Sequence, residues 1–319
     1  MDVSVTLGSQ GLPRELVIAT RESALALWQA QHVQALLLQL YPSLKVSLLS
    51  MSTQGDRLLG SSLAKIGGKG LFVKELERSL EQGRAHIAVH SLKDVPMQLP
   101  QGFCLAALLP RADPRDAFVS NNFDSLDALP PGARVGTSSL RRESQLRAKW
   151  PHLKILPLRG NVQTRLRKLD EQDYESIILA TAGLVRLGLE SRIREILTPE
   201  QMLPAVGQGA LAIECLQAEE ALCRLLAPLN DMHTADCVNA ERALSRALAG
   251  SCNVPLAGFA QIEQGQLRLR AYVGLPDGTR HVVGHCTGPT TEAERLGQQL
   301  ANELRAQGAG DILAAVEQD

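Results

Sequence analysis

Arginine and hydroxyl side chains gather where a predicted strand runs into a predicted helix. Residues 136–142 read Gly-Thr-Ser-Ser-Leu-Arg-Arg and include Ser139, Arg141 and Arg142. The planar guanidinium group of arginine matches the geometry of a carboxylate or a phosphate. Arginines near a helix N-terminus oppose the helix dipole, and a bound anion would offset that cost. We therefore expect an anion-binding cradle here, with a solvated first helical turn as the alternative.

The segment 19–23, Ala-Thr-Arg-Glu-Ser, stands in the same setting at another predicted strand end. Backbone N–H groups at the start of a helix favour an anion, and Arg21 and Ser23 can add donors. Taken alone, however, this segment favours a simpler interpretation, which is a helix cap by Thr20 or Ser23.

Three further arginines follow later predicted strands. Arg159 lies in the Leu-Arg-Gly-Asn segment 158–161, Arg165 stands about one helical turn further on, and Arg186 follows the next strand. A single arginine is most often an exposed surface residue. Several cations at strand ends of one sheet indicate instead a ligand that carries many negative groups.

A carboxylate and a lysine stand side by side just past a predicted strand. Residues 89–96 read Val-His-Ser-Leu-Lys-Asp-Val-Pro, which contains Lys93 and Asp94. The two could form an ion pair that only holds a turn. Their position at a strand end facing an expected cleft makes Asp94 the candidate for acid–base work or for stabilising a cation.

The segment 65–71, Lys-Ile-Gly-Gly-Lys-Gly-Leu, resembles a phosphate-binding loop only superficially. It lacks the G-x-x-x-x-G-K-[ST] order, so it is weak support for nucleotide binding. We expect instead a mobile lid that carries the cations Lys65 and Lys69.

The cysteines are spread along the chain without a C-x-x-C pair, so their spacing predicts neither a zinc site nor a disulfide scaffold. They stand at Cys104, Cys215, Cys223, Cys237, Cys252 and Cys286. Free cysteines are usually small buried apolar residues, which suits Cys104, Cys215 and Cys286. Cys252 differs because it lies in a Gly-Ser loop before a proline, where a thiolate could be exposed. Without an evident triad, a papain-like hydrolase is not supported.

Short apolar runs alternate with helical patterns from residue 16 onward, which is typical of an α/β fold. The expected strands are 16–19, 45–49, 87–89, 134–136, 155–156 and 176–180, and the expected helices include 71–80, 140–149, 162–169 and 183–187. Two such units, with crossings near 109–110 and 207–209, suggest two lobes around a ligand-binding cleft. After about residue 228, a helix at 235–248, strands at 266–270 and 281–286, and a helix at 292–304 predict a small α+β domain.

Composition excludes several classes of protein. The chain of 319 residues has 33 basic and 34 acidic side chains and only 3% aromatic residues, which argues against nucleic-acid binding. Apolar runs such as 105–109 are strand-sized, so no membrane span is expected. We see no secretory signal at the N-terminus, and the cysteine usage suits a reducing compartment, so we expect a cytoplasmic protein.

These segments, in this order and spacing, resemble the porphobilinogen deaminases, also called hydroxymethylbilane synthases. The resemblance runs from about Leu16 to the C-terminal helix. Its most specific stretches are 65–77, 88–96, 113–118, 136–142, 203–214 and the loop of Cys252. Two departures are Ser251, where many relatives have glycine, and Gln54, where some have arginine.

The resemblance implies a transferase of tetrapyrrole (haem) biosynthesis. Cys252 would hold a dipyrromethane cofactor through a thioether, and four porphobilinogen molecules would be deaminated and joined head to tail into hydroxymethylbilane. Each pyrrole ring carries an acetate and a propionate, so the growing chain accumulates negative charge. The family also implies a monomer that binds porphobilinogen, while composition and cysteine spacing lead us to expect no nucleic-acid partner, no membrane association and no metal. The alternative from another class is a non-enzymatic two-lobe protein that binds an anionic solute.

The resemblance also implies roles for individual residues. Asp94 would be the catalytic carboxylate and would contact the cofactor, and residues 65–70 would form the flexible loop over the site. The expected cofactor ligands are Lys93, Ser139, Arg141, Arg142 and Arg165. The expected substrate ligands are Arg21, Ser23, Arg159 and Arg186.

The implied fold has three α/β domains, of which the first two are similar to hinged periplasmic binding proteins. The third is a small α+β domain that presents the cysteine loop. We expect domain 1 at 1–109 with 210–227 returning to it, domain 2 at 110–209 and the C-terminal domain at 228–319.

Overall fold

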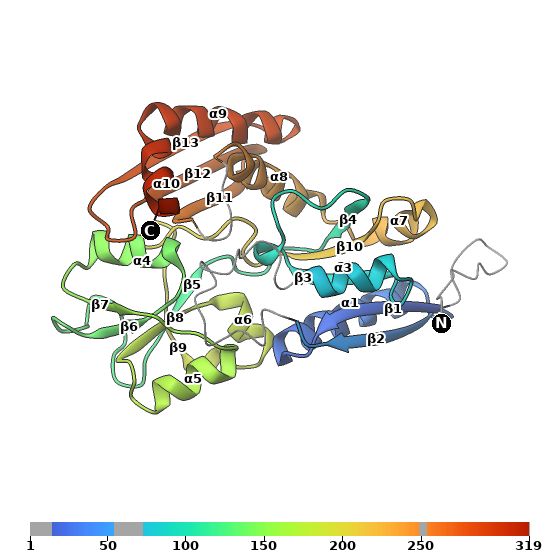
Figure 1. Cartoon of the computed structure of the whole chain (residues 1–319), viewed down its shortest axis with the longest axis horizontal. Coiled ribbons are helices and arrows are strands. Elements are labelled where there is room, and N and C mark those ends of the chain that lie inside the picture. The colour runs from blue at the N-terminus through green and yellow to red at the C-terminus, as the bar shows by residue number, and fades with distance from the viewer. Residues whose placement is uncertain (1–14, 54–72, 249–253, 319) are drawn as a thin grey trace. The chain divides into compact units, whose positions relative to one another are not determined.

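The computed structural model describes residues 15–53, 73–248 and 254–318 (Figure 1). These residues fold into two compact units. Unit 1 comprises the described residues up to Arg111 together with Ala210–Ala235, and unit 2 comprises Ala112–Gly209 and the residues from Asp236 onward. The chain thus passes between the units after Arg111, after Gly209 and again after Ala235.

Unit 1 is built on a five-stranded sheet with the strand order β2-β1-β3-β10-β4. Its strands are β1 (Glu15–Arg21), β2 (Lys45–Met51), β3 (Ile87–Ser91), β4 (Phe103–Leu108) and β10 (Leu211–Leu216). The helices described in this unit are α1 (Ala24–Leu40), α3 (Lys74–Glu81) and α7 (Glu220–Leu226), with the 3-10 turns η2 (Leu92–Asp94) and η4 (Ala227–Leu229). β2, β1 and β3 are parallel, whereas β10 runs antiparallel to β3 and β4.

The residues that return to unit 1 extend past η4. The Leu108 N–H donates to the side-chain oxygen of Asn230, and the Asp231 N–H donates to the Leu108 carbonyl. The Arg111 N–H donates to the Thr234 hydroxyl over 2.9 Å. These bonds lie within the first turns of α8 (Met232–Ala247) and the segment before it. They keep the chain through Ala235 with unit 1.

The first half of unit 2 repeats the same design, with the strand order β7-β6-β8-β5-β9. Its strands are β5 (Asp116–Val119), β6 (Arg134–Gly136), β7 (Lys154–Leu156), β8 (Ser176–Ala180) and β9 (Ile193–Ile196). Its helices are α4 (Leu140–Lys149), α5 (Val162–Asp170) and α6 (Thr181–Arg186), with the turn η3 (Glu190–Arg192). β7, β6 and β8 are parallel, and β5 is antiparallel to both of its neighbours.

The C-terminal part of unit 2 is a three-stranded antiparallel sheet with helices packed on it (Figure 1). It contains β11 (Leu256–Glu263), β12 (Gln266–Gly274), β13 (His281–Pro289), the turn η5 (Thr290–Glu292), α9 (Ala293–Ala306) and α10 (Ala309–Gln318). Leu267 and Leu269 are buried while Arg268 between them is exposed, which confirms the alternation expected for a sheet with one face open to water.

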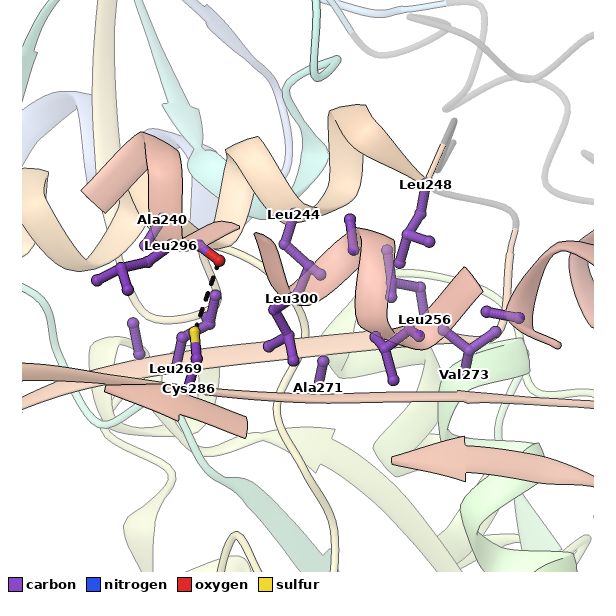
Figure 2. Close-up of a cluster of buried hydrophobic side chains, with 14 of the residues drawn as sticks. Ala240, Leu244, Leu248, Leu256, Leu269, Ala271, Val273, Cys286, Leu296 and Leu300 are labelled. Atoms are coloured by element: carbon purple, nitrogen blue, oxygen red, sulfur yellow. Dashed lines mark hydrogen bonds between the residues drawn. The ribbon is translucent and has the colours of Figure 1, made fainter. Parts of the chain in front are cut away.

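Aliphatic side chains of α8, α9 and the sheet form one core, seen in Figure 2. Leu244 of α8, Leu300 of α9 and Leu269 of β12 are each fully buried in it. Cys286 lies in this core and its thiol donates to the Leu296 carbonyl over 3.5 Å (Figure 2). The α/β lobes and the small α+β domain expected from the sequence are thus confirmed.

Within the described ranges, no helix combines the length and the hydropathy that crossing a membrane requires.

Candidate functional site

In unit 1 the candidate residues meet at one edge of the sheet. β1 and β3 are parallel neighbours with Ile18 opposite Ile87, so their carboxyl ends lie together. Arg21 is the last residue of β1, and Lys93 and Asp94 form η2 directly after β3. The side chain of Asp94 is exposed, whereas Lys93 and Arg21 are half-buried. Parallel topology therefore brings Arg21 to the same sheet edge as Lys93 and Asp94, although it is far from them in the sequence.

Ser23 caps helix α1, as the simpler interpretation of its segment predicted. Its hydroxyl accepts the Ala26 N–H at 3.3 Å, and the neighbouring Thr20 hydroxyl donates to the Ala26 carbonyl at 3.0 Å. The Gln29 amide donates to the Ser91 hydroxyl at 2.7 Å, which ties α1 to the end of β3 just before Asp94. These hydrogen bonds fix the start of α1, after β1, and link α1 to the end of β3.

Unit 2 repeats this arrangement with a second set of candidates. β6, β7 and β8 are parallel, so the segments that follow them leave the same edge of the sheet. Ser139 follows β6, Arg159 follows β7, and Arg186 ends the helix that follows β8. Ser139 is the N-cap of α4 and accepts the Arg142 N–H at 3.5 Å. The strand order of this sheet thus produces the expected grouping of cations at its strand ends.

Arg165 and Arg186 are anchored to backbone carbonyls. Arg165 Nε donates to Gly160 at 2.8 Å, and Arg186 Nη2 donates to Gly209 at 2.7 Å. Burial lowers the pKa of Arg186 to about 10, so this guanidinium keeps its charge at neutral pH in spite of partial desolvation. A hydrogen bond to a main-chain carbonyl therefore fixes the orientation of each of these two guanidinium groups.

Arg141 and Arg142 lie in the interior rather than on the surface. Both are buried, with 4% and 5% of their surface exposed, and both pair with the fully buried Asp116 of β5. Arg141 Nη2 lies 2.8 Å from Oδ2 of Asp116 and Arg142 Nη2 lies 2.7 Å from Oδ1. The alternative of a solvated first turn is therefore wrong, because this turn packs its arginines into the sheet.

The anion nearest to this pair belongs to the chain itself. Burial alone would raise the pKa of Asp116, but the charges of Arg141 and Arg142 lower it far below its ordinary value. The Gln208 amide adds a third donor, 2.9 Å from Asp116 Oδ1. Each arginine also donates through Nη1 to a carbonyl, Arg141 to Leu203 at 2.7 Å and Arg142 to Ile178 at 2.9 Å.

The charges of this buried cluster do not balance. Two guanidinium groups against one carboxylate leave an excess of one positive charge, which is costly in a buried setting. The Nε–H groups of Arg141 and Arg142 are buried, and among the described residues neither has an acceptor. A ligand carboxylate could balance the surplus positive charge and accept hydrogen bonds from the Nε–H groups. These residues therefore fit a cofactor built of acid-bearing pyrroles.

A second buried charge cluster, which the sequence did not reveal, lies in unit 1 on β3, β10 and α3. His90 Nε2 is 2.8 Å from Oε2 of Glu214, and both side chains are buried. Burial, reinforced by the charge of Glu214, raises the pKa of Glu77 on α3 to about 7. The histidine and both glutamates come from three separate elements, so no local motif announces them.

Three predicted residues, Cys252, Lys65 and Lys69, lie outside the described residues. Their predicted roles stay predictions.

Comparison with known proteins agrees with the cofactor chemistry of this site. Residues 16–224 match the family model described as "Porphobilinogen deaminase, dipyromethane cofactor binding domain", and residues 235–306 match "Porphobilinogen deaminase, C-terminal domain". The larger part of the chain is therefore a domain that binds a dipyrromethane cofactor.

Whole-chain relatives give the same result. A porphobilinogen deaminase of Nitrosomonas europaea is 60% identical over 95% of this chain and 99% of that protein. One from Methylobacillus flagellatus is 58% identical over 95% of this chain and 98% of that protein. The chain belongs to the porphobilinogen deaminase family. The family match supports the enzyme rather than the non-enzymatic alternative.

Two solved structures of binding proteins align less closely. A putative methionine-binding lipoprotein from Bacillus subtilis aligns with a TM-score of 0.41 and 12% identity, over 67% of this chain and 90% of that chain. The aliphatic sulphonate binding protein of Escherichia coli aligns with a TM-score of 0.39 and 14% identity, over 74% of this chain and 75% of that chain.

The raised pKa of Glu77 makes stability depend on pH. Its carboxyl group titrates near its ordinary value of 4.5 when unfolded and near 7 when folded. The folded state therefore holds a proton that the unfolded state releases, and the free energy of unfolding falls as pH rises through this window. From about pH 5 to about pH 8, we expect Glu77→Gln to gain about 1–3 kcal/mol relative to wild type in urea unfolding. The exposed Glu15→Gln serves as the control, since Glu15 does not contribute to the shift of Glu77, and parallel pH profiles of Glu77→Gln and wild type would contradict the assignment.

Proposed function

We propose that this chain joins four porphobilinogen molecules into the linear tetrapyrrole hydroxymethylbilane. Each addition releases one ammonia, and water releases the finished product. The observation that carries this proposal is the buried cluster around Asp116, with its surplus positive charge and two unused Nε–H donors, inside the domain that binds the cofactor. A cytoplasmic location and a monomeric state belong to the same proposal and rest on the family resemblance.

The cofactor is proposed to be bound covalently by Cys252. When bound, the dipyrromethane supplies the pyrrole carbon to which the first substrate is joined, together with carboxylates that need cationic partners. In unit 2, Arg141 and Arg142 would present their Nε–H groups to these carboxylates. Ser139 and Arg165, at the same sheet edge, and Lys93 of unit 1 are the further proposed ligands.

Substrate carboxylates are proposed to bind at the two sheet edges as well. Arg159 and Arg186 of unit 2 and Arg21 and Ser23 of unit 1 are the proposed ligands. The anchoring of Arg186 to the Gly209 carbonyl fixes the direction of its guanidinium before any ligand arrives. Fixed cations bind an acidic ligand with less loss of side-chain entropy than flexible surface arginines would.

Asp94 is proposed as the catalytic carboxylate. It is exposed at the end of β3, beside Lys93, where its oxygens can reach a bound ligand. A substrate that loses ammonia develops positive charge on its pyrrole, and a fixed carboxylate stabilises that charge. The same oxygens can accept the pyrrole N–H and take part in proton transfer at the leaving amine.

The covalent anchor is tested by intact-mass spectrometry. We expect the purified chain to carry the mass of a dipyrromethane and Cys252→Ala to have the mass of the bare chain, because only this thiol is proposed to form the thioether. Cys286→Ala removes a thiol of the C-terminal core and should keep the adduct. The same adduct on Cys252→Ala would refute the anchor.

The role of Asp94 is tested by separating turnover from binding. We expect Asp94→Ala and Asp94→Asn to keep the cofactor mass but to lose about 10²–10⁴-fold in kcat, because charge stabilisation and proton transfer are both removed. Retained cofactor serves as the internal control for folding and binding. A near-normal rate of ammonia release would remove Asp94 from the mechanism.

A further inference from the structure

Three cysteines that are far apart in the sequence converge in unit 1. Cys104 on β4 and Cys215 on β10 are directly opposite each other in the antiparallel pair. Cys223 comes from α7, the helix that follows β10. The Sγ atoms are 3.7 Å apart for Cys104 and Cys215, 3.9 Å for Cys104 and Cys223, and 3.5 Å for Cys215 and Cys223. Each sulfur is therefore in contact with both of the others.

The size of this sulfur triangle is the size that a metal ion requires. A tetrahedral site with zinc–sulfur bonds of about 2.3 Å has sulfur–sulfur edges of about 3.8 Å. The three distances, from 3.5 to 3.9 Å, lie close to that value. An ion just outside the plane of the triangle would reach all three sulfurs at normal bond lengths.

The surroundings select the kind of ion. Cys215 is fully buried in the apolar core of unit 1, and Cys104 and Cys223 pack against the same core while remaining half-exposed. The ligand atoms are all thiol sulfurs, which favour soft ions such as Cu⁺ and Zn²⁺ over hard ones such as Mg²⁺ or Ca²⁺. Because Cys104 and Cys223 are half-exposed, an ion and a water ligand can reach the sulfur atoms from solvent.

We propose that Cys104, Cys215 and Cys223 form a three-thiolate site for one thiophilic metal ion, either Zn²⁺ or Cu⁺. Each S–H bond that breaks gives its proton to solvent as a sulfur–metal bond forms, so binding releases up to three protons. Neither the metal nor the sulfur changes oxidation state. Zn²⁺ would take one water as its fourth ligand, whereas Cu⁺ is satisfied by three sulfurs.

Proton release is the step that the metal must drive. Burial is the largest cause that raises the pKa of the thiols of Cys104 and Cys215. The hydrogen bond with Cys215 lowers the pKa of Cys104, whereas the charge of Glu214 raises it. Because a cysteine binds metal as a thiolate, metal affinity should increase as the pH rises.

The experiment uses the full chain with its cofactor, stripped of metal by a chelator and kept reduced. It is mixed with one equivalent of Zn²⁺ or of Cu⁺ in separate arms, desalted and analysed for metal by mass spectrometry. We expect about one ion per chain for at least one of the two metals and a rise in the thermal unfolding midpoint with that metal.

Matched variants locate the site. Cys223→Ser and Cys104→Ser, which alter the half-exposed thiols, should lower the retained metal to about a tenth of wild type and abolish the shift in midpoint. Cys286→Ser removes a thiol of the C-terminal core and should bind as wild type does. Absence of bound Zn²⁺ and Cu⁺ in wild type, or full retention in both Cys223→Ser and Cys104→Ser, would overturn the proposal.

Discussion

The burial of two guanidinium groups against one carboxylate is the constraint on which the rest of this site depends. Asp116 of β5 is fully buried and ionised. Arg141 and Arg142, from the first turn of α4, each form an ion pair with one of its carboxylate oxygens. A buried pair that lost one partner would cost about 3–5 kcal/mol, so the three groups must stay together. The arrangement leaves one positive charge over, and we propose that an acid-bearing cofactor balances it.

Sheet order explains why the other candidate residues share the edges of two sheets. In each unit, three parallel strands place their carboxyl ends side by side, and an antiparallel strand, β10 or β5, returns beside them. The loops that leave these ends carry Asp94 in unit 1 and Arg159 in unit 2. One topology, used twice, thus supplies the proposed catalytic carboxylate and the proposed cations of this porphobilinogen deaminase family member.

The sequence predicted the parallel strands and the helices after them because each short apolar run is followed by a segment with helical periodicity. It missed β5 and β10, whose residues are buried on both faces and show no alternation. Asp116 stood within a stretch that carried the family resemblance, but nothing local showed that it would be buried between arginines. Likewise, the spacing of Cys104, Cys215 and Cys223 predicted no cluster, since only the pairing of β4 with β10 and the packing of α7 bring the thiols together.

The central claim is that an anionic cofactor satisfies the surplus charge of Arg141 and Arg142 around Asp116. Urea unfolding of the cofactor-carrying chain, compared with Cys252→Ala and Cys252→Ser that lack the adduct, tests this claim most directly. The account predicts that the cofactor-carrying chain is more stable by at least about 1.5 kcal/mol, the value of one charged hydrogen bond, and that added inorganic sulfate narrows the gap. Equal stability of all three proteins, with no response to sulfate, would contradict it.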